Sequence, residues 1–199
     1  MNVRLKYYME FTAGCCYNHD IAMANYQMNL HMLTVSQRSE DHNVALERIK
    51  YFVYKQLESS IFINVEDKDR CRLLSDAGLR LTTLPTEPFD QIIGLMLYSK
   101  LNAIMEGRMI ITELEFSSDI GSNVVYLHNE EESVGPFKQD GWWGESDLRH
   151  HHGMIDNTKI MSMNRDSTWR DLDLGWAKSD EDHTGNTIVF ADFNRHAPK

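Results

Sequence analysis

The segment PTEPFDQIIGLMLYSKLNAIMEG, residues 85–107, decides the fold because it contains a helix with both ends marked in the sequence. Thr86 is a residue type that caps helix N-termini, and Pro88 is tolerated in a first turn, where Asp90 also places favourable negative charge. Apolar residues recur at helical spacing at Phe89, Ile92, Ile93, Met96, Leu97, Leu101 and Ile104. Gly107 can adopt the left-handed conformation that ends a helix. We therefore predict a helix that begins at Thr86 and ends at Gly107.

The flanking segments alternate between strand and helix patterns. Their predicted order is a strand over residues 5–12, a loop over 13–20, a strand over 26–35, a helix over 41–58, a short strand over 61–65, a short helix over 67–76, an alternating segment over 79–84, and strands over 109–116 and 124–128. The 109–116 strand has an apolar face and an acidic face, formed by Ile110, Leu114 and Phe116 and by Glu113 and Glu115. The core order is therefore strand, strand, helix, helix, strand, strand, with a small insertion between the helices.

Composition places the chain among proteins with an apolar core and an acidic surface. A chain of 199 residues, 42% of them hydrophobic, is one domain or one domain with an appendage. The 20 Lys and Arg against 30 Asp and Glu give a formal charge of -10, which disfavours nucleic-acid binding. No apolar run reaches the ~20 residues that span a bilayer, and no secretion signal follows Met1, so we expect no membrane association. The odd number of cysteines, with Cys15 and Cys16 adjacent, suits a reducing compartment, and we expect a cytoplasmic protein.

The composition changes after residue 128. Residues 130–132 are all Glu, the Gly135-Pro136 pair follows, and Trp-rich segments come next. We therefore expect a core over residues 1–128 and a C-terminal Trp-rich extension over residues 129–199.

Three short motifs occur in the order found in a known family. Asn25-Tyr26 opens the second strand, Ile63-Asn64 follows the first helix, and Pro85-Thr86 opens the second. With the element order over residues 5–128, they make the chain resemble the tunnelling fold (T-fold) of 6-pyruvoyl- and 6-carboxytetrahydropterin synthases and GTP cyclohydrolase I. The resemblance implies an α+β architecture, ββααββ, in which a four-stranded antiparallel sheet carries two helices on one face. It also implies a homo-oligomer, because a single such sheet leaves edge strands open.

The chain departs from this family at the metal and catalytic positions. The family's zinc takes three imidazoles, two of them from a His-Gly-His before Asn-Tyr, and here Ala22-Met23-Ala24 stands in that place. The third zinc histidine would fall near Cys15 or Cys16. The family's Asp-His pair would fall on Ser59-Ser60, which cannot act as acid or base near neutral pH. We therefore expect neither a bound metal nor a cofactor.

The family also anchors its heterocycle with a Glu on the strand after the second helix. Glu115, with Glu113 as its alternative, lies on that strand, although the Thr that follows the family's Glu is missing. Such a carboxylate would accept two hydrogen bonds from the N–H edge of a guanine- or pterin-like ring. Both acids also fit the solvated face of an alternating strand, and this alternative stays open. The expected ligand-binding residues are Glu115, Glu113, Cys15, His19 and His31.

The cysteine and histidine positions leave further alternatives open. Cys15 and Cys16 could form a metal or thiolate–imidazole site with His19 and Asp20, or lie as small buried cysteines in a loop. His31, on the polar side of its strand, suits a tunnel or a neighbouring subunit as well as simple exposure. The adjacent His150 to His152 cannot all converge on one ion, which favours a surface or interface loop there.

Two hypotheses for function follow. The first is a homo-oligomeric T-fold protein that binds or converts a pterin- or purine-like heterocycle at subunit interfaces; whether it is an enzyme stays open. The second is a non-catalytic assembly or interaction protein that retains the fold without the family's active site. A third alternative is an unrelated α+β fold with a metal site at His150 to His152 and His183.

Overall fold

The first two strands form a long antiparallel hairpin. β1 (Arg4–Tyr17) and β2 (Asp20–Thr34) pair over their whole lengths in the computed structural model, which describes residues 3–18, 20–129, 135–138, 141–148 and 168–177. The loop predicted over 13–20 is wrong, because both strands continue through most of it. The Gly14 N–H donates to the Ser60 carbonyl at 2.7 Å, and a Cβ added to Gly14 would lie 3.0 Å from Ile61. The small residues that resemble a loop therefore let a neighbouring strand come close.

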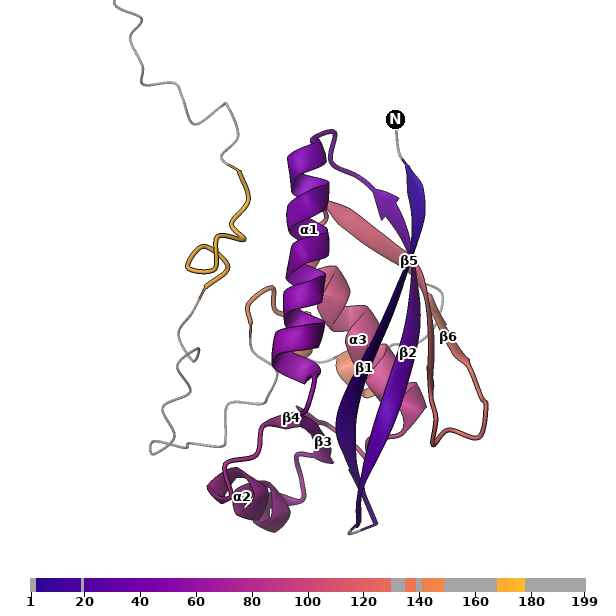
Figure 1. The fold of residues 1–199 in the computed structure, drawn as a ribbon, viewed down its shortest axis with the longest axis vertical. Coiled ribbons are helices and arrows are strands. Elements are labelled where there is room, and N and C mark those ends of the chain that lie inside the picture. Colours follow the sequence, from indigo (N-terminus) through magenta and orange to yellow (C-terminus); the bar gives the residue numbers. More distant parts are fainter. Residues whose placement is uncertain (1–2, 19, 130–134, 139–140, 149–167, 178–199) are drawn as a thin grey trace, which may run out of the picture.

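Six strands form one sheet, in the order β4-β3-β1-β2-β5-β6 (Figure 1). The other four strands are β3 (Ile61–Asn64), β4 (Leu81–Leu84), β5 (Met109–Ser118) and β6 (Tyr126–Asn129). The expectation of four strands is wrong, because β3 and β4 extend the antiparallel β1, β2, β5 and β6 by parallel pairing at the edge of β1. β3 and β4 are almost wholly buried, including the two threonines at the centre of β4, and such burial is typical of parallel strands covered on both faces. The segments predicted as an insertion are thus part of the sheet.

Two helices cover one face of this sheet (Figure 1). α1 (Ser39–Tyr51) continues into the π-helical η1 (Phe52–Leu57), which together confirm the helix predicted over 41–58. The second is α3 (Asp90–Met105), and the short α2 (Lys68–Asp76) connects β3 to β4. Within the described ranges, none of the helices has both the length and the apolar character that crossing a bilayer requires.

α3 starts later than predicted and ends two residues before the predicted Gly107. The helix begins at Asp90 rather than at Thr86, because Glu87 precedes Pro88 and a residue before proline is held out of helical conformation. Phe89 is still extended, with φ -72° and ψ 154°. At the other end α3 stops at Met105, where Glu106 is already left-handed with φ of 48°, and Gly107 follows in the predicted left-handed conformation with φ of 71°.

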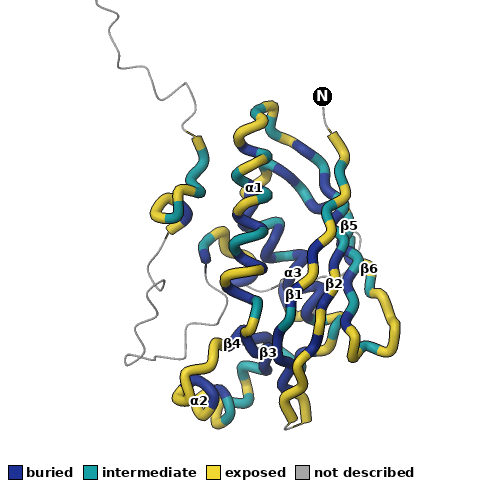
Figure 2. Tube along the Cα trace, in the orientation of Figure 1, coloured by how far each residue is buried: buried dark blue, intermediate teal, exposed yellow. Residues whose placement is uncertain are grey.

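The core lies between the sheet and the two helices, where Figure 2 shows the buried segments gathered. The fully buried Tyr26 stacks on Phe11 and on Phe116, with ring centroids 5.2 and 5.6 Å away. Gly94 lets α3 approach β6, since a Cβ added there would lie 2.4 Å from Nε2 of His128. The helix therefore rests directly on a buried imidazole.

A fully buried lysine joins α3 to the chain beyond residue 129. The Lys100 ammonium donates to the carbonyls of Trp142, Glu145 and Asp147, at 2.9, 2.7 and 2.8 Å. Trp142 belongs to η3 (Trp142–Gly144), which follows η2 (Gly135–Lys138), and its indole N–H donates to the Thr83 carbonyl at 3.1 Å. Charge and hydrogen bonding thus fix this loop on the helix.

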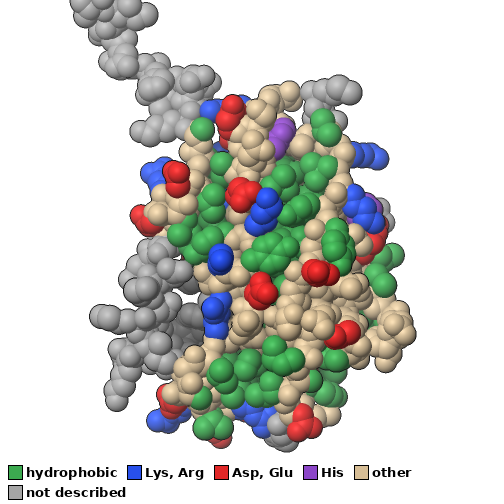
Figure 3. Space-filling model, viewed as in Figure 1, with side chains coloured by type: hydrophobic (Ala, Val, Ile, Leu, Met, Phe, Trp, Pro, Cys, Tyr) green, Lys and Arg blue, Asp and Glu red, His purple; other side chains and the backbone are tan. Residues whose placement is uncertain are grey.

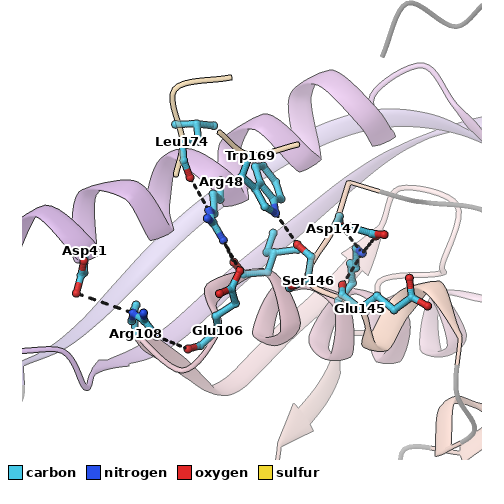
Figure 4. Close-up of polar contacts among 11 residues, drawn as sticks. Asp41, Arg48, Glu106, Arg108, Glu145, Ser146, Asp147, Trp169 and Leu174 are labelled. Atoms are coloured by element: carbon cyan, nitrogen blue, oxygen red, sulfur yellow. Dashed lines mark hydrogen bonds and ion pairs between the residues drawn. The ribbon is translucent and has the colours of Figure 1, made fainter. Parts of the chain in front are cut away.

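Arg48 of α1 holds the 168–177 segment in the same way (Figure 4). Its Nε donates to the Leu174 carbonyl and its Nη1 to Glu106 Oε1, both at 2.8 Å. The guanidinium carbon lies 3.8 Å from the ring centroid of Trp176 and 4.9 Å from that of Trp169, within cation–π range. In Figure 1 this segment lies to the left of α1 and the sheet to its right, so α1 is packed from two sides.

Candidate functional site

A β-bulge decides which side chains reach the open face, which is the face of the sheet opposite α1 and α3. The pairing of β2 with β5 shifts beside His31, where Thr112 is the extra residue. The Thr112 hydroxyl donates to the His31 carbonyl at 3.1 Å. Because successive strand residues alternate between faces, the bulge keeps Ile111 in the core while Glu113 and Glu115 turn to the open face.

Glu115 is the centre of a polar cluster on the open face. Its Oε1 lies 3.0 Å from the Lys6 ammonium and 2.8 Å from Nε2 of His31. Its Oε2 accepts from the Asn29 amide at 2.8 Å. These hydrogen bonds, that of His31 first, lower the pKa of Glu115 below its usual value. The carboxylate is therefore ionised at neutral pH, with three of its acceptor positions in use.

The structure brings together three of the predicted ligand-binding residues. Glu113 Oε1 lies 3.7 Å from His31 Nε2, and one ligand atom from each of His31, Glu113 and Glu115 lies within 4.8 Å of the other two. Their side chains are 35%, 40% and 25% exposed. The group we call the Glu115 cluster, formed by Lys6, Asn29, His31, Glu113 and Glu115, therefore offers an imidazole and two carboxylates to solvent.

A trough of about 930 Å³ adjoins this cluster. Its lining residues are Glu10, Phe11, Thr12, Asn25, Gln27, Tyr54, Glu58, Ser117, Ser118, Asp119, Asn123 and Val125. Ser117 follows Glu115 by two residues on the same strand face, a separation of ~7 Å. The lining includes the carboxylates of Glu10, Glu58 and Asp119 and, among the described residues, no Lys or Arg. The trough therefore favours N–H donors or cations over phosphate groups.

Asp119 and Asn25 form a fixed part of the trough wall. The Asp119 carboxylate accepts from the Asn25 backbone N–H at 2.9 Å and from its side-chain amide at 2.7 Å. The Asn25 Oδ1 in turn accepts from the Thr12 hydroxyl at 2.8 Å. The backbone and side-chain hydrogen bonds from Asn25 lower the pKa of Asp119. The wall thus keeps a negative charge at neutral pH.

Cys15 does not belong to this cluster. The register places Glu115 opposite Asn29 and Cys15 opposite Ala22, seven residues away along β2 or ~23 Å. The Cys15 thiol donates to the Pro88 carbonyl at 3.2 Å, and burial raises its pKa to about 11. It is therefore protonated at neutral pH and a poor nucleophile. The residues His19, His150 to His152 and His183 lie outside the described part of the chain.

Sequence reasoning missed four residues of this surface: Lys6, Asn29, Asn25 and Asp119. A signal for the first two exists, because Lys6 and Asn29 occupy the polar side of the strands predicted over 5–12 and 26–35. Which of these side chains meet depends on the hairpin register, and the wrongly predicted loop leaves that register undefined.

Comparisons with known proteins support the fold. No family model and no curated protein sequence matches the chain. Among solved structures, an uncharacterised protein from Wolinella succinogenes is similar with a TM-score of 0.50 at 11% identity, over 66% of this chain and 99% of that one. A catalytic-residue variant of 6-pyruvoyltetrahydropterin synthase from Plasmodium vivax gives a TM-score of 0.41 at 12% identity, over 65% and 99%.

The resemblance to the T-fold is confirmed at the level of architecture. Two long antiparallel strands, two helices on one face and two further antiparallel strands follow in the expected order. The Wolinella succinogenes protein shares this fold over nearly its whole length. Identity this low carries no information on activity, which therefore has to come from the chemistry of the site.

Proposed function

We propose that this protein binds a small planar heterocycle of the pterin or purine class on the open face of its sheet, as a homo-oligomer. The proposal is carried by one observation, the ionised Glu115 carboxylate beside a trough that three more carboxylates line and that no Lys or Arg of the described segments lines. A ring with adjacent N–H groups is the complement of such an acceptor. The negative lining favours an unphosphorylated ring over a nucleotide.

An incoming ring competes with groups that Glu115 already holds. The Lys6 ammonium is 50% exposed, so it can return to solvent at little cost when a ring N–H takes its place. Glu113 is 40% exposed and lies on the same strand face, which makes it the second acceptor. The ring's N–H edge would then be shared between Glu115 and Glu113.

Binding is favoured over conversion by the groups at the family's catalytic positions. The buried Ser60 hydroxyl is hydrogen-bonded to Thr82 at 2.9 Å, and neither residue titrates near neutral pH. The Cys15 thiol, with its pKa raised to about 11, is no better a nucleophile. We therefore propose a binding protein that performs no acid–base step with these residues.

The homo-oligomer is supported by the outer edge of β1. β1 pairs with β3 at Gly14 and Cys15, and among the described residues no strand pairs with its outer edge over residues 4–11. Figure 3 shows hydrophobic side chains on the front of the molecule, in the seam between α1 and β1. Partly buried apolar residues of those two elements are Leu5, Tyr7, Leu46 and Tyr51. An unpaired edge beside an apolar seam is a surface that a second copy would cover.

The same edge supports a second candidate function, a non-catalytic assembly protein. Association through the backbone edge of β1 and its apolar seam needs no ligand and none of the side chains of the Glu115 cluster. In this alternative the open face would be a solvated surface, and the protein would act through the surfaces that it presents to partners.

Calorimetric titration with neopterin, guanosine, 7-deazaguanine and GTP tests the first candidate. We expect the unphosphorylated compounds to bind more tightly than GTP. Glu115→Gln should weaken binding by about 10- to 100-fold, since a hydrogen bond to a charged group contributes about 1.5–3 kcal/mol. Glu47→Gln is the matched control, because Glu47 is an exposed acid on α1 that also pairs with a lysine, Lys50.

Two results would count against these proposals. No heat with any of the four compounds would remove the heterocycle proposal and leave the assembly protein. A monomer at micromolar concentration in analytical ultracentrifugation would contradict the homo-oligomer that both candidates require.

A further inference from the structure

We propose that His31, Glu113 and Glu115 bind a divalent first-row transition-metal ion, for which Zn²⁺ is the probe. The inference goes beyond the proposed function, because the ion needs no heterocycle and no second subunit. It also differs from the zinc site of the family that the sequence resembles, whose histidine positions are occupied here by Ala22 and Ala24.

The geometry of the three side chains is close to that of a metal site. Ligand atoms ~2.1 Å from a tetrahedral ion lie ~3.4 Å from one another. His31 Nε2 lies 2.8 Å from Glu115 Oε1 and 3.7 Å from Glu113 Oε1, on either side of that value. One ligand atom from each residue lies within 4.8 Å of the others, so shifts of about 1 Å bring all three to one ion. Side chains that are a quarter or more exposed can make such shifts.

The Lys6 ammonium already places a positive charge beside the proposed metal ligands. The Lys6 ammonium lies 3.0 Å from Glu115 Oε1, the same oxygen that His31 contacts. The Lys6 side chain is 50% exposed and reaches the cluster from β1, so a dication can replace it and release it to solvent. The lysine therefore acts as a competitor for the ion.

Asn29 orients the Glu115 carboxylate for metal binding. The Asn29 amide donates to Glu115 Oε2 at 2.8 Å, which leaves Oε1 turned toward His31 and Lys6. Partners of this kind, which hold the non-ligating atom of a ligand side chain, are usual around protein metal sites.

The donor set indicates the class of ion. Imidazole with two carboxylates suits Zn²⁺, Mn²⁺, Co²⁺ or Fe²⁺, whereas Mg²⁺ and Ca²⁺ prefer oxygen ligands alone. Three protein ligands leave a coordination position open to water or to a further ligand. We therefore expect selectivity for Zn²⁺ over Mg²⁺.

Calorimetry on the full-length, chelator-treated protein tests the inference, with ZnCl₂ as titrant and Co²⁺ absorption as a second readout. We expect one equivalent of Zn²⁺ per chain and no heat with MgCl₂. The measurement uses a variant in which His150, His151 and His152 are all Ala, so that those histidines cannot supply the site. Heterocycles are absent, so this result is independent of the test of the proposed function.

Two substitutions should act in opposite directions. Glu113→Gln removes a ligand and should weaken Zn²⁺ binding at least 10-fold, whereas Lys6→Met removes the competitor and should tighten binding several-fold. The Co²⁺ spectrum should change in Glu113→Gln and persist in Lys6→Met. Zn²⁺ affinity that is unchanged in Glu113→Gln, or weakened in Lys6→Met, would overturn the proposal, and so would the absence of binding. Because both side chains are at least 40% exposed, neither change should unfold the protein.

Discussion

Lys100 on α3 and Lys6 on the open face of the sheet both carry an ammonium group near a carboxylate, but they differ in exposure and in their hydrogen-bond acceptors. Lys100 has no exposed surface and donates to three backbone carbonyls. Lys6 is half exposed and shares one carboxylate oxygen with an imidazole. The carbonyls around Lys100 belong to a packed loop and hold fixed positions, whereas the exposed side chains around Lys6 can exchange hydrogen-bond partners. We therefore expect the contacts of Lys100 to stabilise one conformation, and those of Lys6 to be replaced when a ligand binds to the open face.

The largest expected effect comes from removing the buried charge. Lys100→Met keeps most of the apolar stem but leaves the buried carbonyl of Trp142 and the part-buried carbonyls of Glu145 and Asp147 without this donor. We expect the free energy of unfolding to fall by about 2–4 kcal/mol, since an unsatisfied buried group costs about 1–3 kcal/mol and a part-buried one costs less. Guanidinium chloride unfolding followed by circular dichroism measures the change.

Lys6→Met is the matched control for that experiment. An exposed ion pair contributes about 1 kcal/mol at most, so this variant should unfold near the wild-type midpoint. Equal losses in the two variants would show that the contrast between the two lysines is wrong.

A smaller effect is expected at the contact between α3 and β6. Gly94→Ala would normally stabilise a helix by about 1 kcal/mol. Here the new methyl would lie 2.4 Å from Nε2 of the buried His128 and 3.3 Å from Cβ of Phe116. Because overpacking costs about 1–3 kcal/mol, we expect a net loss of stability, measured as a lower Tm.

Gly144→Ala provides the comparison, because no atom of the described part of the chain, apart from the two neighbouring residues, lies within 4 Å of a Cβ built there. Its Tm should stay within a degree or two of the wild-type value. A Gly94→Ala variant as stable as Gly144→Ala would mean that the packing of α3 on His128 is loose.

The smallest effect is expected on the open face, at Asp119. Its folded-state pKa is depressed below 3.8 by the hydrogen bonds of Asn25, so the pairing stabilises the fold above that pH and is lost as pH falls through the folded pKa. In Asn25→Ala the pKa of Asp119 should rise toward 3.8, as followed by NMR titration of its carboxyl carbon. The stability gap between variant and wild type should narrow below about pH 4. If the free energies of unfolding of Asn25→Ala and wild type differ equally at pH 7 and pH 3, the loss of stability comes from packing and not from the charge of Asp119.

Much of the fold could be predicted because its hydrophobic periodicity is strong. The helices around Ile49 and Met96 and the strands around Met28 and Leu114 lie where the pattern indicated. The errors occur where tertiary contacts override local preference. Gly14 is a poor strand residue, yet it lies in β1 because β3 approaches it.

The site could be predicted only in part, for a related reason. The alternation of Glu113 and Glu115 indicated an acidic face, and both residues reach the open face. The bulge at Thr112 could not be read from the sequence, so Ile110 was expected in the core where Ile111 is buried. The meeting of Lys6 with Glu115, 109 residues apart, depends on a register that no local pattern encodes.

The burial of Lys100 has a consequence for how the chain can be divided. Composition changes after residue 128, but the carbonyls that satisfy this ammonium come from Trp142, Glu145 and Asp147. A truncated chain that stops at residue 128 would leave a cation facing Phe52, whose ring centroid is 5.8 Å from the Lys100 nitrogen. We therefore expect the sheet, the helices and the 142–148 loop to unfold as one cooperative unit. The change in composition after residue 128 would then not mark the end of a folding unit.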